Sequence, residues 1–454
     1  MAKSTTKDMT QGNPTRLILG FALPMLLGYL FQQFYSMVDT IIVGQWLGVS
    51  SLAAVGSTGS INFMIIGFCM GVCNGFAIPV AQRFGSGDYV SLRKFVANSV
   101  WLSAVFAVIM TVLVCYFCMD ILVLMDTPSD IIKEAYDYIF VIFLGIPVTY
   151  LYNLLSGIIR SLGDSKTPVY FLVLSSIINI VLDIVTISVW NMGVEGPAWA
   201  TVISQAVSGI LCLLYMMKKF EILRIQKEEW ALDGHYIKIL CSMGLPMGLQ
   251  YSITAIGSVV IQTAVNGLGS MYVAAVTAGN KVSIFLCCPF DALGGTMATY
   301  AGQNVGAKKL NRIHQGIKSA TIIGFLYAIV ACVVLTVFGD NIVLLFLDAA
   351  EAEIIGLAHQ LLIIISAFYI LLVIVNNFRF CIQGMGFSTF AILAGVCEMI
   401  GRAGVGFGLV PFWGYTAICF ASPVAWILAD IFLIAAYFIC HNRLKRVFGE
   451  EKEN

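Results

Sequence analysis

The sequence contains few charged residues. Asp, Glu, Lys and Arg together make up 11% of its 454 residues, whereas soluble globular domains carry about 25%. Apolar residues account for 59% of the chain and give a mean hydropathy of +0.91. The net charge is +0, so no bulk attraction to nucleic acid is expected. This composition excludes a soluble protein and predicts one whose surroundings are the lipid bilayer.

Sequence motifs of enzymes and of metal sites are also missing. The chain contains no His-Glu-x-x-His motif, no Gly-x-Ser-x-Gly motif in a suitable context and no nucleophile with a paired histidine. Its four histidines are expected in loops or at helix ends, and its 13 cysteines are scattered through apolar segments. We therefore expect no enzyme and no resident cofactor, with the cysteines packing as small hydrophobic residues.

Apolar runs long enough to cross a bilayer recur along the whole chain. A spanning helix needs about 20 apolar residues, and we predict twelve such segments in an all-α polytopic membrane protein. Their approximate limits are residues 16–47, 51–82, 95–118, 134–157, 169–190, 196–217, 238–266, 273–302, 313–338, 355–380, 388–410 and 414–440. Because this number is even, both termini are expected on the same side of the membrane.

Basic residues indicate which side that is. They gather between the second and third predicted spans, after the sixth and eighth spans and after the last one, for example at Arg93, Lys218, Lys309 and Arg443. The opposite loops hold almost no basic residue besides Lys133. Since short loops rich in Lys and Arg stay in the cytoplasm, we predict cytoplasmic termini and a place in the bacterial inner membrane.

The two halves of the sequence repeat each other. "PMLLGY" at residue 24 matches "PMGLQY" at residue 246, and "WLGVSSLAAVG" (46–56) matches "GLGSMYVAAVT" (267–277), with an offset that stays between 221 and 223 residues. Six spans per half give both halves the same orientation, a parallel repeat typical of transporters. We therefore predict an N-lobe at residues 1–217, a cytoplasmic linker at 218–237 and a C-lobe at 238–454.

Several phrases of the sequence resemble those of a known protein family. "VDTIIVGQWLG" (38–48), "RSLGDSKTP" (160–168) and the stretch from Gly193 to Thr201 resemble the multidrug and toxic compound extrusion (MATE) family, in particular its bacterial MepA-like multidrug-export branch. The resemblance covers essentially the whole chain. It implies a secondary transporter with two six-helix lobes and alternating access. Lipophilic drugs or toxic organic cations would leave the cell as Na⁺ or H⁺ enters, and we expect the protein to act as a monomer.

The resemblance also implies a cation-coupling site in the first lobe. The residues that match the family's motif are Asp39, Asn179, Asp183 and Thr201. Other family members use carboxylates on the first and fourth helices of the second lobe. Here the seventh and tenth predicted spans have no acidic residue in their interiors, and the seventh offers Gln262 instead. The coupling site is therefore expected in the first lobe.

Depth in the membrane predicts the same site without the family. Asp39, Asp183 and Thr201 each lie five to eight residues from the outer end of a predicted span, which at the helical rise is roughly 8–12 Å below the outer surface. Asn179 lies one turn deeper, on the same helix face as Asp183. Their oxygen atoms could coordinate Na⁺, or the two carboxylates could share a proton; both remain open. The alternative is that each acid is a hydrogen-bonded structural residue, which is less common at membrane depth.

The second half has ionisable residues of its own. Glu398 and Arg402 lie four residues apart in "CEMIGRAG", and we expect an internal ion pair. The alternative is a second-lobe site where Asp291 and Glu398 attract a proton or a cationic substrate. Asp430 has no evident partner, and Arg379, near an inner helix end, is predicted to extend its side chain toward the membrane surface.

Three further residues, which flank the region of Asp39, are candidates for a drug-binding cavity, namely Tyr35, Met37 and Met64. Aromatic rings attract cations and methionine adapts its shape. The rival function is a flippase for a lipid-linked oligosaccharide or another lipid. It would need a cationic cavity for phosphates, whereas the membrane charges of the first lobe are acidic. An ion channel is disfavoured by the twofold repeat without a filter-like loop.

Overall fold

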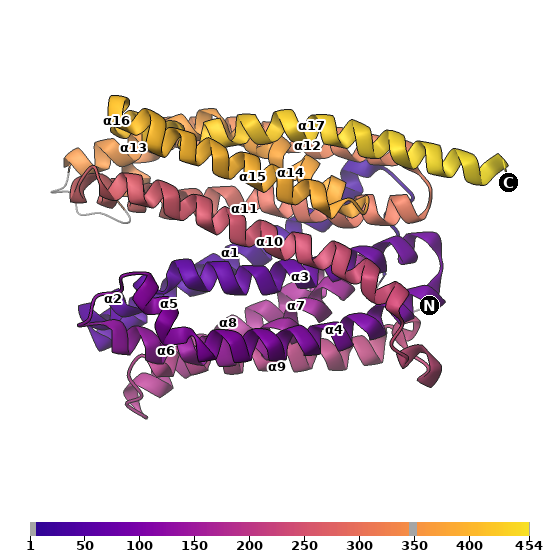
Figure 1. Ribbon diagram of the computed structural model, residues 1–454, viewed down its shortest axis with the longest axis horizontal. Helices are drawn as coiled ribbons and strands as arrows, with labels where there is room; N and C mark the ends of the chain where they lie inside the picture. The colour runs from indigo at the N-terminus through magenta and orange to yellow at the C-terminus, as the bar shows by residue number, and fades with distance from the viewer. Residues whose placement is uncertain (1–5, 345–351, 454) are drawn as a thin grey trace. The chain divides into compact units, whose positions relative to one another are not determined.

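The computed structural model describes residues 6–344 and 352–453 and folds them almost entirely into helices (Figure 1). Among these described residues, ten helices are long and apolar enough to cross a membrane, and two bent helix pairs raise the number to as many as twelve. The all-α polytopic membrane fold expected from the sequence is confirmed.

The helices follow one another with short connections. The first half contains α1 (Pro14–Leu47), α2 (Val49–Ser57), α3 (Gly59–Ser86), α4 (Tyr89–Tyr116), α5 (Cys118–Leu124), α6 (Ile132–Leu144), α7 (Ile146–Ser161), α8 (Lys166–Ser188) and α9 (Glu195–Lys219). Two short 3₁₀-helices follow, η1 (Glu221–Leu223) and η2 (Lys227–Trp230). The second half contains α10 (Gly234–Asn266), α11 (Ser270–Gly306), α12 (Leu310–Val343), α13 (Ala352–Ala367), α14 (Tyr369–Gly384), α15 (Ser388–Ala403), the π-helix η3 (Gly404–Leu409), α16 (Val410–Trp413) and α17 (Tyr415–Glu453).

The chain divides into two compact units whose limits fall inside α1 and α10. The first unit comprises the segment that ends at Asp8 together with Leu27–Ser252, and the second comprises Met9–Leu26 and the chain from Ile253 onward. Hydrogen bonds explain why the start of α1 belongs to the second unit. The Met9 N–H donates to Gln303 Oε1 at 2.8 Å. The lobe limits predicted from the repeat, 1–217 and 238–454, stay a prediction.

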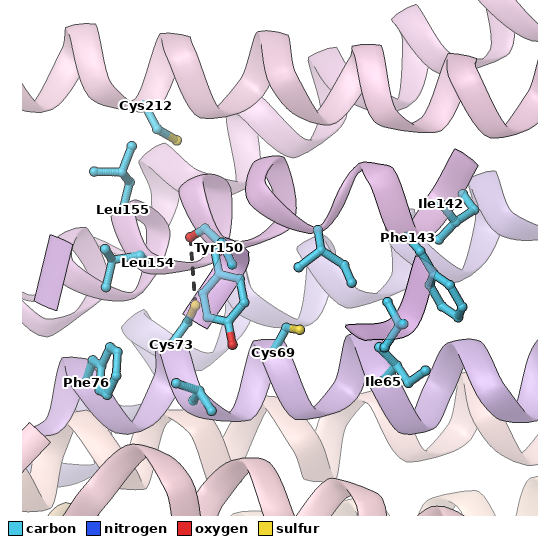
Figure 2. Close-up of a cluster of buried hydrophobic side chains, with 14 of the residues drawn as sticks. Ile65, Cys69, Cys73, Phe76, Ile142, Phe143, Tyr150, Leu154, Leu155 and Cys212 are labelled. Atoms are coloured by element: carbon cyan, nitrogen blue, oxygen red, sulfur yellow. Dashed lines mark hydrogen bonds between the residues drawn. The ribbon is translucent and has the colours of Figure 1, made fainter. Parts of the chain in front are cut away.

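The core of the first unit lies between α3, α6, α7 and α9. Figure 2 shows its buried side chains, which include Cys69 and Cys73 of α3, Tyr150 of α7 and Cys212 of α9. The Cys73 thiol donates to the Tyr150 carbonyl at 3.7 Å. These cysteines are free thiols, so they pack as the small hydrophobic residues that the sequence predicts.

Two spans predicted as continuous helices are broken. The span expected at 134–157 bends by 46° between α6 and α7, and the span expected at 355–380 bends by 53° between α13 and α14. Pro147 in the first turn of α7 has no N–H to bond back to α6. A Cβ atom at Gly145 would lie 2.5 Å from a methyl group of Val202, so glycine there lets α9 approach. The second break, at Phe368, is separated from the first by the offset of the sequence repeat.

Two pairs of glycines let α3 and α10 pack backbone against backbone in the first unit. A Cβ atom added at Gly71 would lie 2.5 Å from the Met247 carbonyl oxygen, and one added at Gly75 would lie 2.5 Å from the Cα atom of Gly244. On the facing helix, Gly244 and Gly248 leave room for aromatic rings of α3. Small residues four apart allow membrane helices to approach this closely, and they join the start of α10 to the first unit.

Replacing Gly75 by alanine is expected to destabilise the protein by roughly 1–3 kcal/mol, because the added methyl group overlaps the backbone of α10. Gly56→Ala in α2 is the matched control, since a Cβ atom there meets nothing within 4 Å and alanine favours the helix. Thermal unfolding of both variants in detergent measures the difference. Equal melting temperatures would contradict the close packing of α3 and α10.

The linker after α9 is held against α4 by an ion pair. The Nε and Nη2 atoms of Arg93 donate to the Glu229 carboxylate at 2.7–2.9 Å, and Glu229 is buried. The same carboxylate accepts from the Gln226 N–H at 2.8 Å, and Trp101 Nε1 donates to the Trp230 carbonyl at 3.2 Å. The hydrogen bonds from Arg93 lower the pKa of Glu229 below its usual value.

Acid is expected to loosen this linker. Because the pKa of Glu229 is lower in the folded than in the unfolded protein, the ion pair stabilises the fold above the unfolded pKa, and this contribution disappears as the pH falls through the folded pKa. Hydrogen–deuterium exchange of residues 221–233, corrected for the intrinsic rate, should accelerate over that range. Glu229→Gln should exchange faster already at neutral pH. Glu221→Gln, which removes an exposed partner of Arg224, should change nothing; equal behaviour of the two variants contradicts the role of Glu229.

Candidate functional site

Two carboxyl groups face each other inside the first unit. Asp39 of α1 and Asp183 of α8 interact electrostatically and lie within hydrogen-bonding reach. Asp183 is fully buried, and Asp39 is half-buried. Within the part of the chain that the structure describes, neither oxygen of Asp183 nor Oδ1 of Asp39 has a hydrogen-bond partner. Two ionised carboxylates cannot hydrogen-bond to each other, so this pair calls for a proton or a cation.

Asn179 and Thr201 extend the same site. The Asn179 Nδ2 atom donates to Thr201 Oγ1 at 3.4 Å, which leaves the buried Asn179 Oδ1 without a partner among the described residues. Thr201 Oγ1 in turn donates to the Pro197 carbonyl at 3.0 Å, as structural threonines in membrane helices do. The arrangement offers carboxylate and amide oxygens but no nitrogen or sulfur ligand, which suits a hard cation.

The loop before α8 fixes where that helix begins. Asp164 Oδ1 accepts from the N–H groups of Lys166 and Thr167, each at 3.0 Å, so it caps the helix N-terminus. Gly163 has a φ of +87°, and a Cβ atom there would lie 2.1 Å from the Lys7 carbonyl. The "LGDSKT" phrase of the sequence therefore sets the start of α8, and with it the register of Asn179 and Asp183.

A glycine near the start of α9 allows Thr201 to reach the site. A Cβ atom at Gly196 would lie 2.7 Å from Thr186 Oγ1 of α8, so a larger residue would push the two helices apart. Thr201 lies just over one turn further along α9, where it meets Asn179.

Two tyrosines complete the surroundings of the acid pair. Tyr35 of α1 and Tyr138 of α6 both interact electrostatically with Asp39 and Asp183. Tyr35 lies one helical turn before Asp39, as the sequence suggested. Tyr138 was missed, because it belongs to the span that bends at Gly145 and nothing in its local sequence marks which face it occupies.

The two methionine candidates are placed differently. Met37 lies two residues from Asp39 on the same helix, which puts it on nearly the opposite face. Met64 of α3 is half-buried and packs against the hydrophobic core of the first unit. Their part in a drug cavity stays a prediction.

In the second unit, Glu398 holds two arginines. Arg402 Nη2 lies 3.2 Å from Glu398 Oε2, so the predicted ion pair is confirmed. Arg379 of α14 also forms an ion pair with Glu398, and both of these side chains are buried. The expectation that Arg379 extends toward the membrane surface is therefore wrong. A guanidinium group gains more from a carboxylate that is already buried than from reaching the surface.

Asp291 does not pair with Glu398. It is exposed on α11, and its Oδ1 atom accepts from Asn376 Nδ2 of α14 at 3.1 Å. The two acids of the alternative second-lobe site therefore do not form a pair, and the role of Asp291 stays a prediction.

Histidines and cysteines form no metal site in the described part of the chain, where no group of three or more His, Cys, Asp or Glu side chains could hold a metal ion. Two histidines depart from expectation, because His359 lies inside α13 and His441 lies inside α17, not in loops or at helix ends. The Nδ1 atom of His359 is 2.7 Å from Asp340 Oδ1.

With this geometry in view, comparison with known proteins identifies the family. Residues 24–185 and 246–407 each match the MatE family model. The chain belongs to the MatE family. The two matches start at the two proline phrases of the sequence repeat, and MatE proteins are transporters, which confirms that the protein is not an enzyme.

Relatives of this MatE chain support the assignment. "Probable multidrug resistance protein YoeA" of Bacillus subtilis is 30% identical over 358 residues, which cover 77% of each chain. "Multidrug export protein MepA" of Staphylococcus saprophyticus is 22% identical and covers 94% of each chain. A solved structure described as an outward-facing multidrug resistance MATE family transporter superposes with a TM-score of 0.90 at 22% identity, covering 98% of this chain and 99% of that one. The last likeness shows that the fold is shared.

Neutralising one acid of the pair is expected to stabilise the protein. In Asp183→Asn the new amide can donate to Asp39, and a hydrogen bond to a charged group contributes roughly 1.5–3 kcal/mol. Thermal unfolding in sodium-free, alkaline buffer should therefore show a higher melting temperature. Asp120→Asn, at an exposed position, is the control and should change little. A lower melting temperature for Asp183→Asn would mean that the carboxylate is an ordinary structural partner.

Proposed function

We propose that this MatE protein is a secondary active multidrug efflux transporter that exports lipophilic or cationic compounds by antiport with Na⁺ or H⁺. The observation that carries the proposal is the Asp39–Asp183 pair of the first unit. Both oxygens of the buried Asp183 and Oδ1 of the half-buried Asp39 lack a hydrogen-bond partner among the described residues. The named functions of the YoeA and MepA relatives support drugs as the cargo.

The coupling ion neutralises the acid pair. Na⁺ would be held by oxygen atoms of Asp39, Asp183 and Asn179, with Thr201 beside them. A proton would instead be shared between the two carboxylates, which cannot both stay ionised at this separation without a large penalty. Either ion removes charge from the part of α1 that belongs to the first unit. Since the opposite end of α1 belongs to the second unit, ion binding acts on a helix common to both, which suits alternating access.

The same proposal places the protein in the bacterial cytoplasmic membrane, as a monomer with both termini in the cytoplasm. The excess of basic residues in alternate loops supports this orientation, and the relatives are bacterial. A lipid flippase remains the rival function. The acidic charges of the site argue against it, because a lipid phosphate needs cationic partners.

Transport in liposomes tests the coupling. A fluorescent lipophilic cation such as ethidium should move through wild-type protein when a Na⁺ gradient or a pH gradient is imposed, and the effective gradient names the ion. Asp39→Asn and Asp183→Asn should each lose nearly all gradient-driven transport, because each substitution removes one of the two carboxylates that bind the coupling ion. Asp120→Asn should transport like the wild type.

Two results would contradict the proposal. Normal coupled transport by Asp183→Asn would move the coupling site elsewhere. Failure of both gradients to drive any drug in the wild type, together with movement of a labelled lipid-linked sugar, would favour the flippase.

A further inference from the structure

We propose that Asp430 of α17 is a proton-binding site of the second unit, and that its proton decides whether Arg379 pairs with Glu398 or with Asp430. This site is separate from Asp39 and Asp183, which belong to the first unit. It does not depend on which ion, if any, the first unit couples to transport.

Asp430 is buried, with 5% of its surface exposed. Neither of its carboxylate oxygens has a hydrogen-bond partner in the described chain. It lies 15 residues into α17, which is about 22 Å along the helix and well inside the membrane. A bare ionised carboxylate at such a position is strongly disfavoured, so the arrangement seen here corresponds to a protonated Asp430.

The neighbouring arginines are distributed unevenly. Glu398 pairs with both Arg379 and Arg402, whereas Asp430 pairs with neither, although Arg379 acts on it electrostatically. The helices that carry these groups, α14 and α15, both pack against α17. Arg379 therefore interacts with two carboxylates, Glu398, which has two arginine partners, and Asp430, which has none.

Charge balance agrees with this assignment. Arg379 also interacts with Asp291, the remaining acid of the group. Two arginines balance two ionised carboxylates, Glu398 and Asp291, only if Asp430 is neutral. When Asp430 loses its proton, a shift of Arg379 gives each buried carboxylate one arginine, Glu398 with Arg402 and Asp430 with Arg379. A buried charge that gains a partner in this way avoids the penalty of isolation.

Other charged groups around α17 are engaged elsewhere or distant. The helix packs against α12, α13, α14, α15, α16 and η3, of which α16 and η3 contain no charged residue. His359 of α13 is paired with Asp340 of α12, and His314 of α12 faces His441, three turns further along α17. Arg379 is thus the described charged group that acts directly on Asp430.

Infrared spectroscopy detects the proton directly. The carboxyl C=O stretch of aspartic acid appears only in the protonated form, and ¹³C-labelled aspartate separates it from glutamic acid. The measurement uses full-length protein with Asp39→Asn and Asp183→Asn already in place, so that the acid pair of the first unit contributes no signal. A labelled C=O band at neutral pH is expected, and Asp430→Asn should abolish it. A band that survives Asp430→Asn overturns the proposal.

A matched pair of variants tests the exchange of Arg379. Glu398→Gln releases Arg379 to Asp430, so the Asp430 band should be lost at neutral pH. Arg402→Gln removes another member of the same group but leaves Arg379 with Glu398, so the band should remain. Identical spectra for the two variants would contradict the exchange.

Should Glu398→Gln fail to fold, Arg379→Gln tests the same step. Without the guanidinium group nothing stabilises ionised Asp430, so its band should persist to more alkaline pH than in the parent protein. A band that disappears at the same pH as in the parent overturns the proposal.

Discussion

The side-by-side burial of two carboxylates is the constraint on which the first unit depends. A packed interior can satisfy one buried acid with donors from its own backbone or side chains. Both oxygens of Asp183 and Oδ1 of Asp39 receive none from the described residues, and the two carboxylates repel each other when both are ionised. Because these oxygens lack donors among the described residues, we propose that an ion that enters and leaves supplies the balancing charge.

Holding such a pair together requires a rigid frame, and glycines provide much of it. Gly163 allows the tight turn that lets Asp164 cap α8, and Gly196 allows α9 to meet the C-terminal end of α8. The Gly71–Gly75 and Gly244–Gly248 pairs lock α3 against α10. In a membrane no hydrophobic force draws helices together, so close packing at small residues has to do so. Of these positions, Gly163, Asp164, Gly196 and Gly248 lie within the phrases quoted from the sequence.

Composition and repetition predicted the fold well, because both are properties of many residues at once. The candidate site around Asp39 and Asp183 could be predicted because acidic residues in apolar helices are rare. Features that depend on one neighbour were missed. Tyr138 and the second partner of Glu398 are contributed by bent spans. A bend at Gly145 or Phe368 gives the two parts of each span different orientations, which one helical periodicity across the whole span does not predict. Arg379 shows the same limit: its buried partner lies 19 residues away on another helix.

Both units contain acidic residues within membrane helices, but the groups that surround these residues differ. The repeat supplies them with matching helices and matching breaks, yet acids gather with oxygen ligands in the first unit and with arginines in the second. A pair of acids has to exchange an ion with its surroundings whenever its exposure changes, which links it to a gradient across the membrane. In the second unit Glu398 has its own arginines and needs no such ion, whereas Asp430 has none, and we assign it a proton. Sequence divergence within one repeated architecture can therefore place an acid pair in one half and an acid–arginine group in the other.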